Sequence, residues 1–482
     1  MCQIRKNDLV GVWLTNRFEW VILQYATARL GALLVSINPL WKLTELEDAL
    51  NVTPVKLIIT MKRNEVTKTN HEQLLSNETR KIQKSQVLYL EDGWTYLRDS
   101  AANVTDTELS EIENSLQFDD AINIKFTSGT VGRVKAALLS HHNILNNAYF
   151  TAVRLGYTEQ DRTCVPVSFS HCFGTVCGIH SSLSMGGCLV IPSETFEIEK
   201  VLTAIEHEKC TSLLGVPTMF MSILNSLKNR ENYDLSSLRT GQIGGAFCPR
   251  ETMELVLTQM NIKQMTIGYG MTENSGCIAQ TFVDDSLERY LSTVGKALDH
   301  TEIKIVNQNT NEVVKRGEIG ELCTRGYHVM LGYYENETAT KQILEPNSKW
   351  LRTGDLAVMD EHDYIQVVGR IKDLIIRGGQ NIYPKEIEEY LTEHPAVNEV
   401  HVIGIPSEKY GEELMAWVKL NSDSRTEPVG EIDLIEFCLD QISSYKIPTH
   451  WKFVEEFPRT ATGKVRKAEM RQISIKELIN RK

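Results

Sequence analysis

A run of small hydroxyl and glycine residues, closed by a lysine, is the first feature of this chain that could do chemistry. Residues 126–135 read Phe-Thr-Ser-Gly-Thr-Val-Gly-Arg-Val-Lys. Glycine lets backbone N–H groups converge on an anion, and the hydroxyls and the lysine add donors and positive charge. The spacing of Gly129 and Gly132 is not that of a Walker A loop, G-x-x-x-x-G-K-S/T. On these residues alone, a phosphate-holding loop and an ordinary hairpin or Ser/Gly turn fit equally well.

The segments around this loop predict a sheet covered by helices. A strand is expected at residues 121–126, directly before the loop, and a helical pattern opens at residues 141–145. In the N-terminal part, Asn16 could cap a helix that runs to Leu30 and carries Phe18, Ile22, Tyr25 and Ala26 on one face. Further strands are expected at residues 9–14, 32–37 and 56–60, and a capping box at residues 44–47. Such alternation of strand and helix favours a parallel sheet with both faces covered.

The rest of the chain changes character twice. Strand and helix continue to alternate as far as the Gly-Met-Thr-Glu turn at residues 270–273. From residue 292 to about residue 369, short alternating segments predict antiparallel strands and a small barrel. From residue 371 a separate α+β domain is expected, with a basic, turn-like tail at residues 459–467.

The composition argues against several classes of function. The 482 residues include 63 acidic and 51 basic side chains, so the formal net charge is −12, which disfavours nucleic acid as the main partner. No apolar run has the length of a transmembrane span. The ten cysteines contain no C-x-x-C pair, which indicates neither a zinc ribbon nor a redox motif and favours a reducing compartment. Cys172, next to His171, is a disfavoured candidate nucleophile, because most such thiols are structural.

Several stretches, taken in order, resemble the adenylate-forming superfamily of acyl-CoA synthetases, aryl-CoA ligases and luciferases. The resemblance covers most of the chain and rests on residues 127–135, 171–174, 244–246, 269–273, 353–355, 369–384 and 462–464. Within the superfamily the chain is most similar to the medium-chain acyl-CoA ligases of the acyl-CoA synthetase family member 2 group, through residues 126–130, 325–333 and 375–379.

The resemblance implies a two-step reaction and a two-domain α/β fold. A carboxylate, expected to be a medium-chain fatty acid, would attack ATP to give acyl-AMP and pyrophosphate, and coenzyme A would then form the thioester. ATP, Mg²⁺ and coenzyme A are the implied cofactors and co-substrates, and small molecules are the implied partners. The implied fold has a large adenylate-forming domain at residues 1–369, with parallel sheets, helices and a small β-barrel. A small mobile α+β domain follows at residues 370–482, with a hinge near Lys372.

The resemblance also implies the residues that bind ATP. The loop should hold the β- and γ-phosphates through Thr127, Ser128, Gly129, Thr130, Val131, Gly132, Arg133, Val134 and Lys135. Glu273 should bind Mg²⁺, because a hard cation prefers oxygen ligands, and Thr272 should donate to the α-phosphate. Asp355 should accept from both ribose hydroxyls, and Arg370 should reach the ribose or a phosphate.

Catalysis and thioester formation are assigned in the same way. The Lys464 ammonium, charged at neutral pH, should meet the carboxylate and the negative charge that develops on the α-phosphate. Without the resemblance, its surroundings would be interpreted as a solvated basic tail. The small domain should rotate at Lys372 after adenylation, and Gly378 and Gly379 should then help to form the pantetheine channel. The residues expected to line the acyl site are His171, Phe173, Gly244, Gly245, Ala246 and Tyr269.

The sequence departs from the superfamily pattern inside the loop. Val131 stands where Thr or Ser is usual, Val134 where Pro is usual, and Ala136 where Gly is usual. The loss of the hydroxyl at residue 131 keeps one alternative open, a nucleotide- or acyl-binding homologue with weak turnover. A second alternative, within the enzymes, is a relative that adenylates an aryl acid or an amino acid and hands the acyl group to a carrier protein. The chain also begins later than superfamily members usually do. The resemblance implies a mitochondrial location, whereas the lack of a transit segment after Met1 implies a cytoplasmic one if Met1 is the true start.

Overall fold

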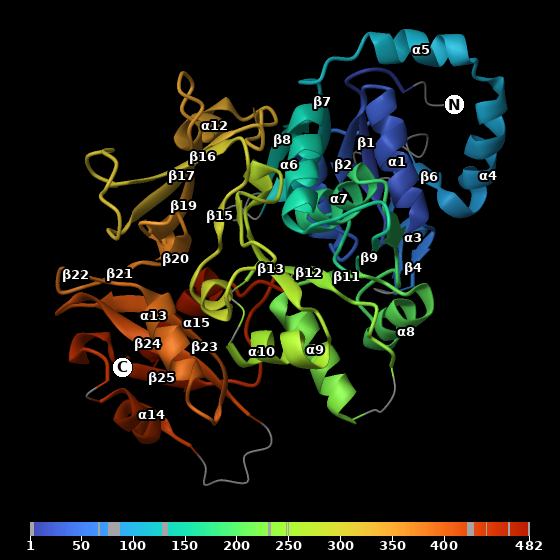
Figure 1. Ribbon diagram of the computed structural model, residues 1–482. Coiled ribbons are helices and arrows are strands. Elements are labelled where there is room, and N and C mark those ends of the chain that lie inside the picture. The colour runs from blue at the N-terminus through green and yellow to red at the C-terminus, as the bar shows by residue number, and fades with distance from the viewer. Residues whose placement is uncertain are drawn as a thin grey trace. The chain divides into compact units, whose positions relative to one another are not determined.

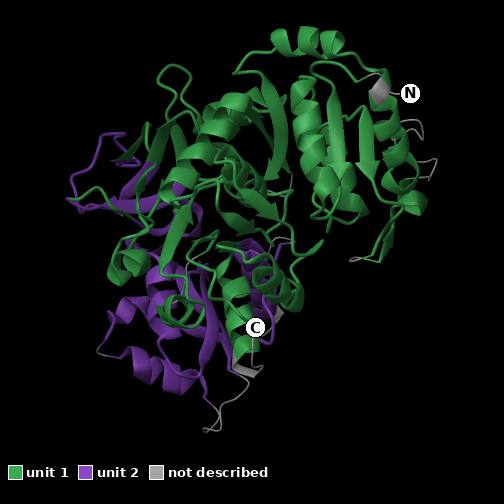
Figure 2. Cartoon of the chain, turned by 45° about the vertical axis from the view of Figure 1, so that its right-hand side comes forward, with its two compact units in different colours: residues 1–304, 323–353, 362–365 green, residues 305–322, 354–361, 366–482 purple. Residues whose placement is uncertain are grey.

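The computed structural model divides into two compact units (Figures 1 and 2). Unit 1 comprises residues 1–304, 323–353 and 362–365, and unit 2 comprises residues 305–322, 354–361 and 366–482. The structure describes residues 4–65, 68–75, 87–127, 134–229, 233–246, 248, 250–421, 429–439, 441–460 and 463–480. The domain boundary predicted between residues 369 and 370 stays a prediction.

The first sheet of unit 1 carries the strand that leads into the Ser/Gly loop. Its order is β18–β8–β7–β2–β1–β3–β6, and its strands from β7 to β6 are parallel, whereas β8 and β18 run antiparallel to their neighbours. The strand bounds are β1 Leu9–Trp13, β2 Leu33–Ser36, β3 Leu57–Thr60, β6 Val87–Tyr89, β7 Ala121–Thr127, β8 Lys135–Ser140 and β18 Gly332–Tyr333.

This sheet is buried on both faces because the side chains of each strand alternate in direction. In β1, Val10 and Val12 pack with Trp20 of α1 (Phe18–Arg29) in one cluster. Trp13 packs with Leu46 of α2 (Leu43–Val52) in another. Helices α1 and α2 thus cover opposite faces of the sheet. The alternation of strand and helix in the sequence predicts this arrangement.

The second sheet of unit 1 has the same parallel character. Its order is β10–β9–β11–β12–β13–β14–β15, and only β14 and β15 run antiparallel to their neighbours. The strand bounds are β9 Arg162–Cys164, β10 Cys188–Val190, β11 Ser212–Gly215, β12 Thr240–Gly244, β13 Gln264–Tyr269, β14 Ala279–Gln280 and β15 Lys296–Ala297. Helices α8 (Ile198–Glu208), α9 (Pro217–Asn229) and α10 (Arg250–Gln259) supply buried residues to one core cluster with these strands.

The region expected to form short antiparallel strands contains a four-stranded sheet. Its order is β16–β17–β19–β20, with bounds β16 Thr301–Val306, β17 Gly320–Gly326, β19 Leu351–Met359 and β20 Ile365–Arg370. A two-stranded ribbon, β4 (Arg63–Asn64) with β5 (Thr69–Asn70), belongs to unit 1.

The C-terminal part of unit 2 is an α+β fold built on a five-stranded sheet. The order is β22–β21–β24–β23, and β25 pairs in parallel with β24. The bounds are β21 Ile375–Arg377, β22 Gln380–Ile382, β23 Val397–Ser407, β24 Gly411–Leu420 and β25 His450–Phe453. Helices α13 (Pro384–Thr392), α14 (Glu431–Cys438) and α15 (Lys467–Asn480) belong to the same part of the chain.

The remaining helices are short or lie between the strands of unit 1. The α-helices are α3 His71–Leu75, α4 Leu90–Ser100, α5 Asp106–Asn114, α6 His141–Arg154, α7 Ser181–Ser184, α11 Leu287–Ser292 and α12 Glu337–Ile343. The 3₁₀ turns are η2 Ala101–Asn103, η4 Thr272–Asn274, η5 Ile371–Asp373 and η6 Ser444–Lys446, and η3 (Phe173–His180) is a π-helix.

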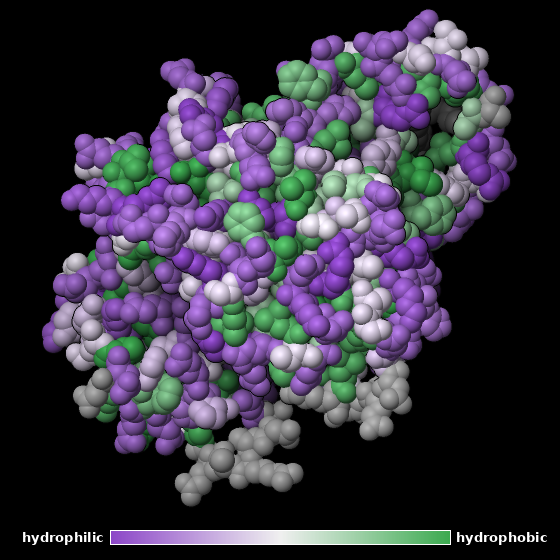
Figure 3. Space-filling view, in the orientation of Figure 1, coloured by the Kyte–Doolittle hydropathy of each residue, from purple (hydrophilic) through white to green (hydrophobic). Residues whose placement is uncertain are grey.

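None of the helices in the described part of the chain combines the length and apolar character that crossing a membrane requires. On the face drawn in Figure 3, hydrophilic residues predominate, and hydrophobic ones occur between them.

Candidate functional site

The two strands that flank the predicted phosphate loop, residues 127–135, form an antiparallel hairpin. Thr127 is the last residue of β7, Lys135 is the first of β8, and the two stand opposite each other in the antiparallel register. Val134 lies directly before β8 and is half-buried. The other predicted loop residues, Ser128, Gly129, Thr130, Val131, Gly132 and Arg133, lie outside the described residues. The hairpin brings the two ends of the predicted loop together.

Thr272 and Glu273 lie in the short turn η4, which follows β13 and contacts both β7 and β8. Both side chains are buried. Ser275 ends the turn in the left-handed region, at φ 60°, and the backbone then reverses toward β14. Thr272 and Glu273, which follow a strand of the second sheet, therefore lie beside β7 and β8 of the first sheet, the two strands that flank the predicted phosphate loop.

Tyr333 fixes the Glu273 carboxylate. Its hydroxyl donates a 2.7 Å hydrogen bond to Glu273 Oε1, and the Met330 N–H donates a 2.9 Å bond to the Glu273 carbonyl oxygen. Burial, and after it the charge of Glu273, raises the pKa of Tyr333, so the phenol keeps its proton and stays a donor. Lys135 Nζ lies 4.9 Å from the centre of the Tyr333 ring, so Tyr333 contacts both Lys135 and Glu273.

The chemistry of Glu273, with Tyr333 and Lys135 beside it, fits a magnesium ion bound together with a nucleotide. No cluster of three or more His, Cys, Asp or Glu side chains that could hold a metal occurs in the part of the chain that the structure describes. Mg²⁺ does not need one, because it is usually held by one or two carboxylates together with substrate phosphates and water. Glu273 is a buried carboxylate that a neighbouring phenol holds in one orientation, and it can supply that protein ligand.

The predicted acyl-site residues of unit 1 partly come together. His171 and Phe173 open the π-helix η3, and the Phe173 N–H donates a 3.2 Å bond to His171 Nδ1. A Cβ atom on Gly244 would lie 3.5 Å from Phe173 Cζ and 3.1 Å from the Gly268 carbonyl oxygen. The Phe173 ring therefore lies close to the end of β12, and the tighter of the two approaches is the one to the Gly268 carbonyl oxygen.

The other three residues of that prediction lie near the ends of β12 and β13. Gly245 has φ +85°, which favours glycine, and Ala246 after it is exposed. Tyr269 is the last residue of β13, pairs with Ala279 of β14, and is half-buried. All three lie at the carboxyl ends of parallel strands, where α/β sheets place ligands.

Cys172 does not have the surroundings of a nucleophile. Its thiol is buried, 3.8 Å from His171 Nδ1 and 3.9 Å from Thr272 Oγ1. His171 Nδ1 already accepts from the Phe173 N–H. The nine cysteines that the structure describes are all free thiols.

The predicted ribose-binding residues form an ion pair in unit 2. Arg370 Nε lies 2.9 Å from Asp355 Oδ1; the Asp355 side chain is almost fully buried, whereas Arg370 is half-exposed. The Gly354 N–H before Asp355 donates a 3.2 Å bond to Glu321 Oε1. Lys372 follows in the turn η5 and is exposed.

Gly378 and Gly379 form the tight turn between β21 and β22. Their φ angles are +56° and +84°, which favour glycine, and the Gly378 N–H donates a 2.8 Å bond to the Tyr410 carbonyl oxygen. A side chain at Gly379 would meet nothing within 4 Å, so its backbone is open on that side.

Lys464 lies on an exposed turn of unit 2. Thr460 N donates a 2.8 Å bond to the Lys464 carbonyl oxygen, Lys464 N donates a 3.1 Å bond to Thr460 Oγ1, and Arg459 pairs with Val465 in an isolated bridge. The predicted basic tail is therefore a hydrogen-bonded turn that carries the lysine, followed by α15. Thr462 before it lies outside the described residues.

Two residues of unit 1 were missed by sequence reasoning. Tyr333 belongs to a stretch that carries the family resemblance, but no local pattern indicates that it contacts Glu273. Lys125 lies in the middle of β7, in an otherwise mostly apolar strand, and is fully buried. A lysine at an inward position of a predicted core strand was the available signal, because lysine is almost never fully buried without a partner.

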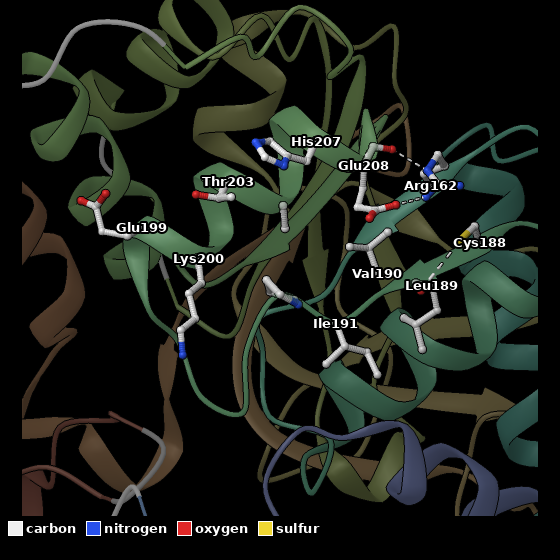
Figure 4. Close-up of a pocket in the computed structure, with 12 residues that line it drawn as sticks. Arg162, Cys188, Leu189, Val190, Ile191, Glu199, Lys200, Thr203, His207 and Glu208 are labelled. Carbon is white, nitrogen blue, oxygen red and sulfur yellow. Dashed lines mark hydrogen bonds and ion pairs between the residues drawn. The ribbon is translucent and has the colours of Figure 1, made fainter.

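A cavity of about 600 Å³ lies elsewhere in unit 1, against β10 and α8 (Figure 4). None of the predicted site residues lines it. Its charged side chains have partners: Arg162 is paired with Glu208, and Lys200 is 2.9 Å from Glu197. This cavity is therefore not the site that the motifs predict.

Comparison with known proteins agrees with the fold and the motifs. The family model of AMP-binding enzymes matches residues 1–334, and that of the AMP-binding enzyme C-terminal domain matches residues 386–464. YngI of Bacillus subtilis, which carries a provisional acyl-CoA synthetase name, is 42% identical over 99% of this chain and 89% of its own length. The mitochondrial medium-chain acyl-CoA ligase ACSF2 of Danio rerio is 40% identical over 98% of this chain and 81% of its own length.

A solved structure gives the same result for the fold. The o-succinylbenzoate coenzyme A synthetase MenE of Bacillus subtilis, in complex with ATP and a magnesium ion, superimposes with a TM-score of 0.78. It is 28% identical, and the match covers 97% of this chain and 90% of that one. The predicted superfamily and the two-domain α/β fold are thus confirmed, and this chain belongs to the AMP-binding enzyme family.

Proposed function

We propose that this AMP-forming acid–CoA ligase activates medium-chain fatty acids. The class of ligase follows from family membership and from relatives that are 40% or more identical over nearly the whole chain and are named as acyl-CoA synthetases or ligases. The medium-chain preference is supported by the name of the Danio rerio relative.

The reaction has two substitution steps. A carboxylate oxygen attacks the α-phosphorus of ATP, and the bond to the β-phosphate oxygen breaks, which gives acyl-AMP and pyrophosphate. The sulfur of coenzyme A then attacks the acyl carbonyl carbon; its proton is lost, and AMP leaves. Both steps depend mainly on placing the reactants and stabilising developing negative charge.

One observation carries the nucleotide part of this proposal. The buried Glu273 carboxylate is held by Tyr333 beside the two strands that flank residues 127–135. In this proposal the loop binds the β- and γ-phosphates, with Lys135 at its end. Thr272 donates to the α-phosphate, and Glu273 is the protein ligand of Mg²⁺. The ion, when bound, neutralises phosphate charge.

Unit 2 supplies the second set of proposed roles. Asp355, oriented by Arg370, accepts from the ribose hydroxyls. Lys464, on its exposed turn, provides the ammonium for adenylation. Lys372 serves as the hinge, and the turn formed by Gly378 and Gly379 borders the pantetheine arm in the second step.

The acyl site is proposed at the carboxyl ends of β12 and β13. Phe173 and the glycines at positions 244 and 245 would form an apolar wall, and His171, Ala246 and Tyr269 would complete it. The Phe173 ring lies close to Gly244, which supports this placement. Ligand sites of this kind are mainly apolar with few polar groups.

A direct test measures both products with a panel of acids. The purified chain is incubated with ATP, Mg²⁺, coenzyme A and acetate, octanoate, palmitate or benzoate, and pyrophosphate and acyl-CoA are quantified. We expect the highest kcat/KM with octanoate and no product when the divalent cation is chelated. Absence of pyrophosphate with every fatty acid would contradict the proposed function. Transfer only to a carrier protein would favour the alternative adenylating enzyme.

We also propose a mitochondrial location, which the name of the Danio rerio relative supports. Fractionation of cells that express the natural gene product should place it with matrix markers. Recovery only with cytosolic markers would contradict this location.

A further inference from the structure

Lys125 is a fully buried lysine placed two residues before the nucleotide loop begins at Thr127. Its side chain is 1% exposed, and it lies in the middle of β7. In the part of the chain that the structure describes, no carboxylate pairs with it. A buried ammonium without an acidic partner is costly, and its hydrogen bonds must compensate for the lost hydration.

The Lys125 ammonium has three oxygen acceptors. Nζ lies 3.0 Å from Ser36 Oγ, 2.8 Å from Thr175 Oγ1 and 3.4 Å from the Ser170 carbonyl oxygen. Thr175 donates its own proton to the Phe169 carbonyl oxygen at 2.5 Å, so its oxygen accepts from Lys125. The three N–H donors of the ammonium thus match three acceptors.

Lys125 belongs to a larger set of buried side chains, most of them polar, that joins α1, β7 and η3. We use "the seam" for Trp20 and Gln24 of α1, Asn123 and Lys125 of β7, and Thr175 and His180 of η3, all of which are buried. Asn123 donates a 2.9 Å bond to Gln24 Oε1, and Lys125 Nζ lies 5.4 Å from the Trp20 ring centre. π-Helices such as η3 are rare and frequently occur at functional sites.

On the acyl side, the seam reaches the segment that carries His171 and Phe173. Lys125 bonds to Ser170 and Thr175, which bracket both residues. On the nucleotide side, Lys125 belongs to the strand that ends at Thr127. A single side chain therefore links the base of the predicted phosphate loop to the predicted wall of the acyl site.

We infer that Lys125 is a positioning residue whose ammonium holds the strand before the nucleotide loop against residues 170–175, so that the ATP and acyl sites keep one relative placement. This inference rests on the proposed function, because it takes residues 171 and 173 as part of the acyl site. Lys125 itself contacts no substrate in this account; it acts through Thr175 and Ser170.

The charge of Lys125 should change close to neutral pH. Burial lowers its pKa to about 7, and the neighbouring Cys172 acts in the opposite direction. His180, the other titratable group of the seam, has its pKa lowered to about 3 by burial and then by the charge of Lys125, so it stays neutral. The contacts that Lys125 makes with α1 and β2, through Trp20 and Ser36, are with uncharged groups. Above pH 7 the neutral amine has only two N–H donors for the three acceptors. The attachment of β7 to residues 170–175 should therefore weaken.

Two variants and a matched control separate positioning from simple destabilisation. Lys125→Met keeps the volume and removes every donor, whereas Lys125→Gln keeps two. Ile124→Val alters the neighbouring buried residue of β7, whose side chain packs in a core on the other face of the sheet. Because a hydrogen bond to a charged group contributes about 1.5–3 kcal/mol, we expect Lys125→Met to raise the KM for ATP and for octanoate by about tenfold or more. Lys125→Gln should restore part of that loss, and Ile124→Val should change neither KM.

The pH dependence of the octanoate KM distinguishes a positioning role of the Lys125 ammonium from a purely structural role of the side chain, because only the positioning role depends on the charge. In the wild type, the octanoate KM should rise between about pH 6 and about pH 8 as the amine loses its proton, and in Lys125→Met this rise should be absent. Equal KM values and equal pH profiles in wild type and Lys125→Met would overturn the inference, as would the same defect in Ile124→Val.

Hydrogen exchange of the substrate-free protein tests the link independently of activity. Lys125→Met should speed amide exchange in residues 170–180 and 121–127, and Ile124→Val should not do so in residues 170–180. If the wild type turns over no fatty acid but the exchange differs as expected, the proposed function fails and the link stands. If turnover is present and exchange is unchanged, the link fails and the proposed function stands.

Discussion

The hydroxyl group of Tyr333 in the edge strand β18 donates a 2.7 Å hydrogen bond to Glu273 Oε1 in the turn η4. The two residues are 60 positions apart in the sequence. The bond sets the orientation of a buried carboxylate that has the chemistry of a magnesium ligand, and it places the phenol ring under Lys135.

Replacing Tyr333 by Phe should weaken the use of magnesium. The change removes one hydrogen bond to a charged, buried acceptor, which contributes about 1.5–3 kcal/mol. A Mg²⁺ titration of pyrophosphate release should show an apparent Mg²⁺ affinity lowered about tenfold or more. Tyr334→Phe is the control, because the Tyr334 hydroxyl bonds to Glu335. An unchanged Mg²⁺ titration in Tyr333→Phe would refute this role.

Asp355→Asn should impair ATP binding more than acid binding. Asp355 is almost fully buried and is paired with Arg370 at 2.9 Å. Loss of the carboxylate removes charge-assisted bonds, so the KM for ATP should rise roughly ten- to a hundredfold while the KM for octanoate changes little. Glu302→Gln, in the exposed pair with Arg325, should leave both values unchanged. Equal increases in the two KM values would argue against a ribose contact.

Val131→Thr should strengthen nucleotide binding. The superfamily resemblance places a hydroxyl at this position, and one additional hydrogen bond of about 1 kcal/mol would lower the ATP dissociation constant about fivefold. Calorimetric titration with ATP measures this directly. The control is Val313→Thr, at an exposed position. A dissociation constant that stays the same or rises would show that a hydroxyl at residue 131 adds no contact to the nucleotide.

Unit 1 should lose stability in mild acid. Burial lowers the pKa of His180 to about 3 and that of His328 to about 3. The unfolded chain, with ordinary histidine pKa values, therefore binds more protons below about pH 6.5, and the free energy of unfolding falls as the pH decreases toward 4. Each histidine contributes a slope of at most about 1.4 kcal/mol per pH unit.

His328→Gln tests that assignment, because glutamine can keep a bond to Thr324, which is 2.7 Å from His328 Nε2. Denaturant unfolding between pH 4 and pH 7 should give a shallower decline in this variant than in the wild type. The substitution of His362, which lies in an exposed turn, by Gln should not alter the slope. Parallel curves for His328→Gln and wild type would exclude His328 as a source of the acid sensitivity.

Local patterns in the sequence predicted much of the fold but not its detailed packing. The helix expected after the loop begins at His141, with Ser140 and Asn143 forming a capping box. Asn16, however, does not cap α1: its side chain bonds instead to the backbone of Val167 and Phe169, in a segment far along the chain. Tertiary hydrogen bonds of this kind leave no mark in the neighbouring residues.

The buried face of α1 shows the same limit. Phe18, Ile22 and Tyr25 share a face, as expected, but that face is exposed, while Trp20 and Gln24 are fully buried. The helix buries Gln24 because Asn123 of β7 donates to it, and Lys125 of β7 lies over the Trp20 ring. A periodicity argument cannot find such a seam, since it treats polar positions as solvent-facing.

The motifs of the candidate site could be found in the sequence because the residues of each motif are contiguous. Tyr333 and Lys125, which hold these motifs in place, belong to no such motif and were not found. Thr272, Glu273, Asp355 and Lys464 each lie in a short recognisable stretch, and their roles stay predictions. The positions of Tyr333 and Lys125 follow from strand order: β18 joins the sheet beside β8, and β7 joins beside β2. Neither pairing can be read from the residues themselves.

The most direct test of the account compares the two half-reactions in Lys464→Ala. Pyrophosphate release from octanoate and ATP should fall by about two to three orders of magnitude, because a group that stabilises the adenylation transition state is removed. Thioester formation from supplied octanoyl-AMP and coenzyme A should continue at close to the wild-type rate. Arg466→Ala, on the same exposed turn, should leave both half-reactions intact. Equal loss of both half-reactions in Lys464→Ala, or no loss of pyrophosphate release, would contradict the account.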